Sequence, residues 1–157
     1  MASELNLYNK FFQYKNDGTI NLNSNTLKVA PATSSYTPSA LHDVLADVLA
    51  SPSPEVVPVA SPSNGYVAGG TTLTGNTVTF TDSPAEGKFD ADDAEWIALT
   101  ATFRYAILYA SGTLNGVLDP LIAWIVLDVT PADIVVAGVD YSIVWSASGI
   151  FIEAKAV

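Results

Sequence analysis

The sequence predicts a mainly β fold: an antiparallel β-sandwich or small barrel with one or two short helices and an extended proline-rich arm. The last third of the chain holds short runs of β-branched, aromatic and other apolar residues, separated by glycine, asparagine and aspartate. A proline-rich stretch crosses the middle of the chain, where neither a helix interior nor a central strand would accept it. No segment of about 20 to 50 residues repeats, which excludes a solenoid.

Length and charge narrow the functional classes. A chain of 157 residues predicts a single domain, residues 1–157. Its 16 acidic and 6 basic residues give a formal net charge of −10, so we expect no nucleic-acid partner, because binding to phosphates needs clustered lysine and arginine. Only 14% of the residues are charged, against about 25% in an average protein, which indicates a surface that partners cover.

The sequence offers no signal for a membrane or a secretory route. The longest unbroken apolar run, Leu121 to Leu127, has seven residues, whereas a bilayer-spanning helix needs about 20. The N-terminus lacks the basic and apolar regions of a secretory signal, so we expect synthesis in a host cytoplasm and no membrane partner. The chain contains no cysteine and is therefore indifferent to the redox state of its compartment.

The N-terminal segment, residues 1–18, has two interpretations between Leu5 and Tyr14. A helix would gather Leu7, Tyr8, Phe11 and Phe12 on one face, whereas a strand would alternate Leu5, Leu7, Asn9 and Phe11. We favour a short helix that Ser3 caps and that ends at Asn16-Asp17-Gly18. A helix of this length is marginal in isolation, so it must pack on another surface.

Two further elements are predicted before residue 51. Thr26 to Ala30 is typical of a strand, closed by Pro31, which cannot donate a hydrogen bond to a neighbouring strand. From Ser39 to Ala50, the residues Leu41, Val44, Leu45, Val48 and Leu49 have helical spacing. A loop followed by a strand is the competing interpretation of that second segment.

Residues 51–70 form the predicted arm or connector, with four of the nine prolines and three of the ten glycines. Proline fixes φ, so this stretch is expected to be extended and to lie at the surface. The next segment, Thr71 to Thr81, alternates threonine with apolar residues and has Gly75-Asn76 near its middle. It predicts a β-hairpin.

Five short runs in the remaining sequence predict strands. They are Trp96–Thr102, Phe103–Tyr109, Leu121–Leu127, Tyr141–Trp145 and Ile150–Ala154. The first two are contiguous, so they are also consistent with one long strand. Strands of this kind, with turn residues between them, are typical of antiparallel sandwiches and small barrels.

Chemically reactive residues are not gathered by any recognisable motif. His42 is the only histidine, and its neighbour Asp43 would diverge from it on a helix, so the two do not form a catalytic pair. One histidine without cysteine cannot build a zinc site of the usual type. The acidic segment from Asp90 to Glu95 lacks the glycine and glutamate spacing of a calcium loop and is interpreted as a solvated loop. We therefore predict a protein that is not an enzyme and has no cofactor, metal or catalytic residues.

The aromatic residues leave one candidate for an exposed contact. Trp124 and Trp145 lie inside apolar runs and are expected in the core. Trp96 follows the acidic segment and is the candidate surface contact, in principle for stacking against a sugar.

Six segments in order carry a resemblance to a known family. They are LYNKF (Leu7–Phe11), TLKVA (Thr26–Ala30), HDVLADV (His42–Val48), NGYVAGG (Asn64–Gly70), FRYAILY (Phe103–Tyr109) and PLIAWI (Pro120–Ile125). Together they resemble small virion structural proteins of tailed bacteriophages. This resemblance implies a β-rich particle component, a decoration or cement protein of the capsid. The proline-rich stretch departs from the family pattern and has the composition of an added arm.

The expectation is therefore a structural protein on the virion head surface that binds the major capsid protein and associates with itself, with a trimer as the expected state. The predicted protein–protein contacts are Leu7, Tyr8, Phe11 and Phe12 in the N-terminal segment and Val56, Val57 and Val59 in the arm. Two alternatives stay open: an adaptor subunit of the neck or tail, and a carbohydrate-binding β-sandwich.

Overall fold

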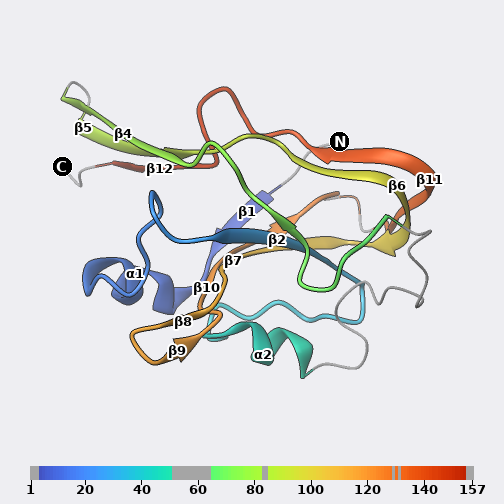
Figure 1. Ribbon diagram of the computed structural model, residues 1–157, viewed down its shortest axis with the longest axis horizontal. Helices are drawn as coiled ribbons and strands as arrows, with labels where there is room; N and C mark the ends of the chain where they lie inside the picture. The colour runs from blue at the N-terminus through green and yellow to red at the C-terminus, as the bar shows by residue number, and fades with distance from the viewer. Residues whose placement is uncertain (1–3, 51–64, 83–84, 129, 131, 155–157) are drawn as a thin grey trace.

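The chain folds into two stacked layers of antiparallel strands, with two short helices below them (Figure 1). This is a computed structural model, and it describes residues 4–50, 65–82, 85–128, 130 and 132–154. The predicted class, a mainly β protein with antiparallel sheets and short helices, is confirmed. The described strands form a sandwich and do not close into a barrel.

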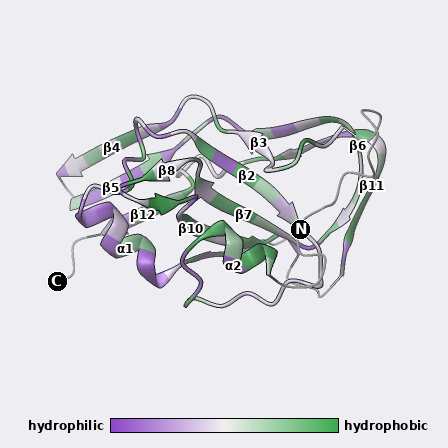
Figure 2. Cartoon of the chain, turned by 60° about the horizontal axis from the view of Figure 1, so that its bottom comes forward, coloured by the Kyte–Doolittle hydropathy of each residue, from purple (hydrophilic) through white to green (hydrophobic). Residues whose placement is uncertain are grey.

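The lower layer is a five-stranded sheet with the order β1-β10-β7-β2-β3. Its strands are β1 (Glu4–Leu7), β2 (Leu27–Ala32), β3 (Thr71–Thr72), β7 (Tyr105–Ala110) and β10 (Leu121–Val126). The central strand β7 pairs with β2 on one side and β10 on the other. Helices α1 (Asn9–Asn16) and α2 (Leu45–Leu49) lie in front of this sheet when the bottom of the molecule comes forward (Figure 2).

The upper layer is a long two-stranded ribbon with one added strand. Its elements are β4 (Thr77–Asp82), β5 (Ala85–Asp90), β6 (Ala94–Phe103), β11 (Ile134–Ile143) and β12 (Phe151–Ala154). β5 leads directly into β6, and β11 returns to β12, so the pairs β6–β11 and β5–β12 follow one another along the ribbon. β4 pairs with the other side of β5. A small hairpin of β8 (Thr113–Leu114) and β9 (Val117–Leu118) forms a separate two-stranded sheet, and its Leu114 and Val117 pack against the core between the layers.

The lower sheet is buried on both of its faces. Leu27, Leu108 and Ile122 belong to the core between the two layers. Ile107 and Leu121 belong to a second core, together with Leu45 and Val48 around α2. A strand that is buried on both faces needs no polar alternation, which explains the continuous apolar run in β7.

The N-terminal segment combines both interpretations of its sequence. The predicted helix is right from Asn9 onward, but Glu4 to Leu7 form strand β1, paired with β10 so that Leu5 lies opposite Ile125. A free edge of the central sheet thus overrides the local helical pattern. Ser3, the predicted cap, lies outside the described residues.

Two other segments are shorter or longer than predicted. The Ser39–Ala50 helix is reduced to α2, because the Asp47 carboxylate accepts hydrogen bonds from the N–H groups of Asp43 and Val44 and starts the helix there. The first strand does not stop at Pro31 but continues to Ala32. Pro31 lies past the end of the pairing with β3, at an edge position where proline is tolerated.

The predicted hairpin over Thr71–Thr81 is wrong. β3 pairs with β2 in the lower layer, and β4 pairs with β5 in the upper layer, so this segment crosses between the layers. Leu73 is buried at the crossing, and its N–H donates to the carbonyl of Leu27 at 2.9 Å. The alternating threonines correctly indicated strand β4, but the sequence did not indicate that its partner is β5.

The contiguous runs around Phe103 also belong to different layers. β6 and β7 are separated at Arg104, whose N–H donates to the Ala32 carbonyl and whose guanidinium pairs with Asp133 at 2.8 Å. The strand expected from Tyr141 begins earlier, because β11 starts at Ile134. β12 lies within the last predicted run.

The burial of the N-terminal helix yields a paired stability prediction. Phe11 is fully buried and its ring lies 5.7 Å from that of Phe151, whereas its neighbour Phe12 is 49% exposed. We expect Phe11→Ala to lower the free energy of unfolding by about 3–5 kcal/mol, because a core cavity is created. Phe12→Ala should cost about 1 kcal/mol or less. Urea unfolding followed by circular dichroism measures both, and equal losses would contradict the placement of α1.

Candidate interaction surface

The N-terminal residues predicted to dock on a partner mostly serve the chain's own core. Tyr8 and Phe11 have no exposed surface, and Leu7 is half-buried against the core between the layers. The Tyr8 ring packs 4.9 Å from Trp124, and its N–H donates to the Ile122 carbonyl. Of the four predicted contacts, Phe12 alone presents a large exposed surface. The docking assignment is therefore corrected for Tyr8 and Phe11.

The contacts predicted in the arm, Val56, Val57 and Val59, lie outside the described residues.

Trp96 is also corrected, because it is only 4% exposed. It packs on the inner side of the upper layer, with its ring 6.3 Å from that of Tyr141. Ala98, with φ of 50°, forms a β-bulge that shifts the alternation of β6. As a result Trp96 points inward and Ile97 is 60% exposed. Simple alternation counted back from the buried Leu99 would have placed Ile97 inside.

The acidic segment holds the bend between β5 and β6. Asp90 pairs with Lys88 at 3.0 Å, Asp92 accepts a hydrogen bond from the Thr74 hydroxyl at 2.8 Å, and Asp93 accepts one from the Trp145 N–H at 2.9 Å. The carboxylates thus bind three separate partners. Among the described residues, no cluster of histidine and acidic side chains is arranged to hold a metal ion.

The single histidine ends a buried hydrogen-bonded chain. The Tyr8 and Tyr36 hydroxyls lie 2.9 Å apart, and the Tyr36 hydroxyl lies 3.0 Å from Nδ1 of His42. These hydrogen bonds connect the β1–α1 junction to the loop before α2. Burial raises the pKa of Tyr8 strongly, and the hydrogen bond with Tyr36 raises it further. The three side chains are thereby linked at the second core, to which Tyr8 and Tyr36 belong.

A first surface that suits a protein partner lies on the ribbon of β6 and β11. We call it the ribbon surface; its exposed large apolar residues are Ile97, Val135 and Val139, at 60%, 73% and 58%. Thr100, Thr102 and Ala137 are exposed beside them. The two strands contain no lysine or arginine and only two acids, Glu95 and Asp140. The Asp140 carboxylate accepts a hydrogen bond from the backbone N–H of Ala98 at the bulge.

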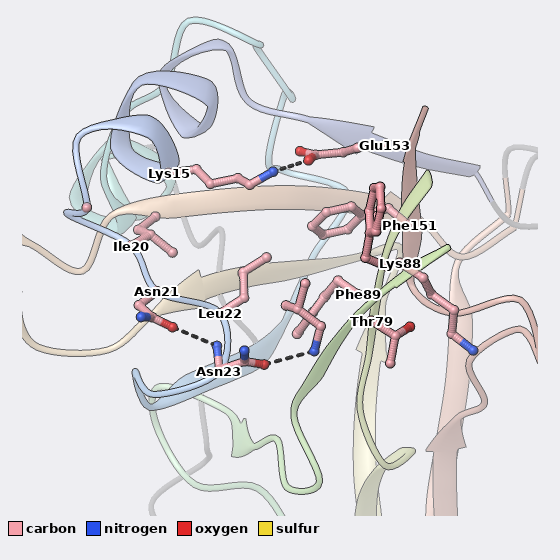
Figure 3. Close-up of a pocket in the computed structure, with 14 residues that line it drawn as sticks. Lys15, Ile20, Asn21, Leu22, Asn23, Thr79, Lys88, Phe89, Phe151 and Glu153 are labelled. Carbon is pink, nitrogen blue, oxygen red and sulfur yellow. Dashed lines mark hydrogen bonds and ion pairs between the residues drawn. The ribbon is translucent and has the colours of Figure 1, made fainter. Parts of the chain in front are cut away.

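A second surface lies where the sheet of β4, β5 and β12 extends beyond the lower layer. We call it the β4 groove, a pocket of about 380 Å³ between this sheet and the loop that follows α1. Figure 3 shows Ile20 and Leu22 on one side and Phe89 and Phe151 on the other. The Lys15–Glu153 ion pair closes one end. Phe80, which is 66% exposed, lines the groove from the edge strand.

The sequence contained a signal for one of these surfaces. Thr77-Val78-Thr79-Phe80 alternates with a period of two, so Val78 and Phe80 had to share one face. Nothing in the sequence indicated that this face would stay uncovered. For the ribbon surface the signal was hidden, because the bulges at Ala98 and Gly138 change the alternation of both strands.

Comparison with known proteins adds no relative: no family model, curated protein or solved structure matches this chain. Neither described helix has the length and apolar character needed to cross a membrane.

The buried tyrosines predict that stability falls at alkaline pH. Burial is the main cause that raises the pKa of Tyr8, Tyr36 and Tyr141 in the folded chain, while an unfolded phenol titrates near pH 10. Since the raised pKa favours the neutral phenol in the folded state, this contribution is complete below about pH 10 and is lost as pH rises above it.

We expect Tyr8→Phe to test this dependence. At neutral pH the variant should lose about 1 kcal/mol of stability, because one hydrogen bond to Tyr36 disappears. Above about pH 10 its stability should fall less steeply than that of the wild type, by the contribution of about one proton. Urea unfolding at a series of pH values measures both, and identical alkaline slopes would contradict the burial of the Tyr8 hydroxyl.

Proposed function

We propose that this protein is a structural component of a virion, a decoration or cement protein that binds neighbouring major capsid subunits on the head and stabilises the shell. Its partners in this proposal are the major capsid protein and further copies of itself, with a trimer as the assembled state. The resemblance of six sequence segments to small virion proteins of tailed bacteriophages suggests this class, and the structure supplies a compatible surface.

The ribbon surface is the observation that carries the proposal. Ile97, Val135 and Val139 are each more than half exposed on adjacent strands. An interface core is poor in charge and rich in apolar side chains, and β6 and β11 have this composition. Because β6 and β11 are paired along their length, the backbone that carries these side chains is already ordered before a partner covers them.

The chemistry of the chain agrees with a role in assembly. Several of its described acids and its histidine are engaged in a bend, a helix start and a tyrosine network, as in Asp93, Asp47 and His42. A net charge of −10 favours a position away from packaged nucleic acid, on the outside of a shell. Many weak contacts repeated over a symmetric shell would hold each subunit through multivalency.

Electron microscopy of virions labelled with an antibody against this chain tests the proposal directly. Label spread over the head is the expected result. Label confined to the neck or tail would replace the decoration role with the adaptor role, and absence of label from intact particles would overturn both.

A matched pair of variants tests the ribbon surface. Ile97 on β6 and Leu118 on β9 are both 60% exposed. Strand β6 belongs to the upper layer, whereas β9 lies at the bottom of the molecule in Figure 1. We expect Ile97→Lys to reduce the amount of the protein recovered in purified particles by about tenfold, because a charge enters the contact. Leu118→Lys makes the same chemical change elsewhere and should leave recovery unchanged. Equal recovery of the two variants would remove the ribbon surface from the interface.

The carbohydrate-binding alternative loses its candidate residue. Stacking against a sugar needs an exposed aromatic face, and Trp96 is 4% exposed.

A further inference from the structure

We propose that the free edge of β4 binds an extended segment of a partner protein, which adds a strand to the sheet of β12, β5 and β4. The segment would place apolar side chains in the β4 groove and basic residues near Asp82 and Glu86. This interaction is separate from the ribbon surface, and it does not depend on the particle to which the chain belongs.

The backbone of β4 is open to such a partner. β4 is the last strand in the order β12-β5-β4, and all six of its residues are exposed. The Val78 N–H donates to Oδ1 of Asn23 at 2.8 Å, so the backbone polar groups of Val78 point away from β5. Because these groups alternate along a strand, the N–H and C=O of Phe80 and Asp82 point to the same free side. An incoming strand finds both groups of Phe80 available.

The groove beside this edge has room for the side chains of an added strand. Val78, Phe89 and Phe151 lie in register across the three strands. Phe80 lies opposite Gly87, where the lack of a side chain leaves the floor of the groove open. Phe80 and Val78 are 66% and 45% exposed, although both line an apolar pocket. A partner strand would cover this apolar surface while it completes the hydrogen bonds of Phe80.

The charges around the groove favour a basic segment. Lys15 and Lys88 are already paired with Glu153 and Asp90. Asp82 and Glu86, near the tip of the β4–β5 hairpin, take part in none of the ion pairs among the described residues. Asp82 lies on the same face as Phe80, and Glu86 lies on the opposite face. Lysine or arginine at neighbouring positions of the partner would complement these carboxylates and give the added strand a preferred direction.

A second copy of the chain fits the edge less well. In a symmetric antiparallel pair centred on Phe80, each Val78 would oppose Asp82 of the other copy and would have to donate its N–H. That N–H is already bound to Asn23. A basic segment, in contrast, is attracted to a chain of net charge −10.

Nuclear magnetic resonance titration of the full chain with a synthetic peptide tests the proposal. The probe is a peptide of alternating valine and threonine with a lysine at each end, and the comparison peptide carries glutamate at both ends. We expect the lysine peptide to shift the Phe80 amide signal and slow its hydrogen exchange, and to bind at least about threefold more tightly than the glutamate peptide at low salt. Absence of binding by the lysine peptide, or binding that leaves the Phe80 amide unprotected, would overturn the proposal.

Three variants assign the effect to the edge. Phe80→Lys should weaken binding by about tenfold or more, whereas Ile152→Lys, on the opposite edge strand of the same sheet and 47% exposed in the wild type, should not change it. Asn23→Ala frees the Val78 N–H and should tighten binding, which a merely structural role of Asn23 would not do. Equal effects of the two lysine variants, or unchanged binding by Asn23→Ala, would contradict the assigned edge.

The oligomeric state provides the remaining control. A wild-type dimer that Phe80→Lys dissociates would overturn the choice of partner in favour of a second copy. Because the titration contains no particles, its failure is distinguishable from failure of the virion labelling experiment.

Discussion

The structure depends on the central strand β7 being buried on both of its faces. Ala106, Leu108 and Ala110 pack into the core between the layers, and Ile107 and Tyr109 pack into the core around α2. Both cores therefore share one backbone, and pairing with β2 and β10 fixes the position of β7 within the lower sheet. The N-terminal segment depends on the same sheet, because the pairing of β1 with β10 positions Tyr8 in the second core.

The upper layer differs from the lower sheet because only its inner face is covered by other parts of the described chain. Its long ribbon bends at the acidic segment, where Asp92 and Asp93 are tied to Thr74 and Trp145. Beyond this bend the sheet of β4, β5 and β12 extends past the lower layer and is supported by the loop after α1. The bend thus separates two surfaces, with the β4 groove on one side and the bulged ribbon on the other. The hydrogen bonds of these two carboxylates hold the strands at an angle.

The sequence predicts the fold class but not the pairing of strands. Runs such as Tyr105–Ala110 and Leu121–Val126 were identifiable because composition alone indicates a buried strand. Their partners were not, since pairing is decided by segments far apart in the chain, and Thr71–Thr81 was assigned a local hairpin for this reason. The prediction that Trp96 is exposed was wrong for a related reason. A single bulge at Ala98 exchanges the faces of Trp96 and Ile97, so the residue predicted at the surface is inside and its neighbour is exposed.

The free edges of the two layers show why β4 is the place where another chain would add. β3 has two residues and β1 has four, so each offers a short template, and bulges at Gly138 and opposite Ala98 interrupt β11. β4 is neither short nor bulged: it is six residues long, has a regular register with β5, and carries the exposed side chain of Phe80.

The Asn23 side chain blocks one backbone donor of β4, the Val78 N–H, at the end of the strand nearest the loop after α1. What stays open is the half that contains Phe80 and Asp82, where apolar surface, free backbone groups and unpaired carboxylates coincide. Unprotected edge strands of this kind favour non-specific pairing with other strands. Pairing at β4 is therefore specific only if one particular partner segment covers the edge.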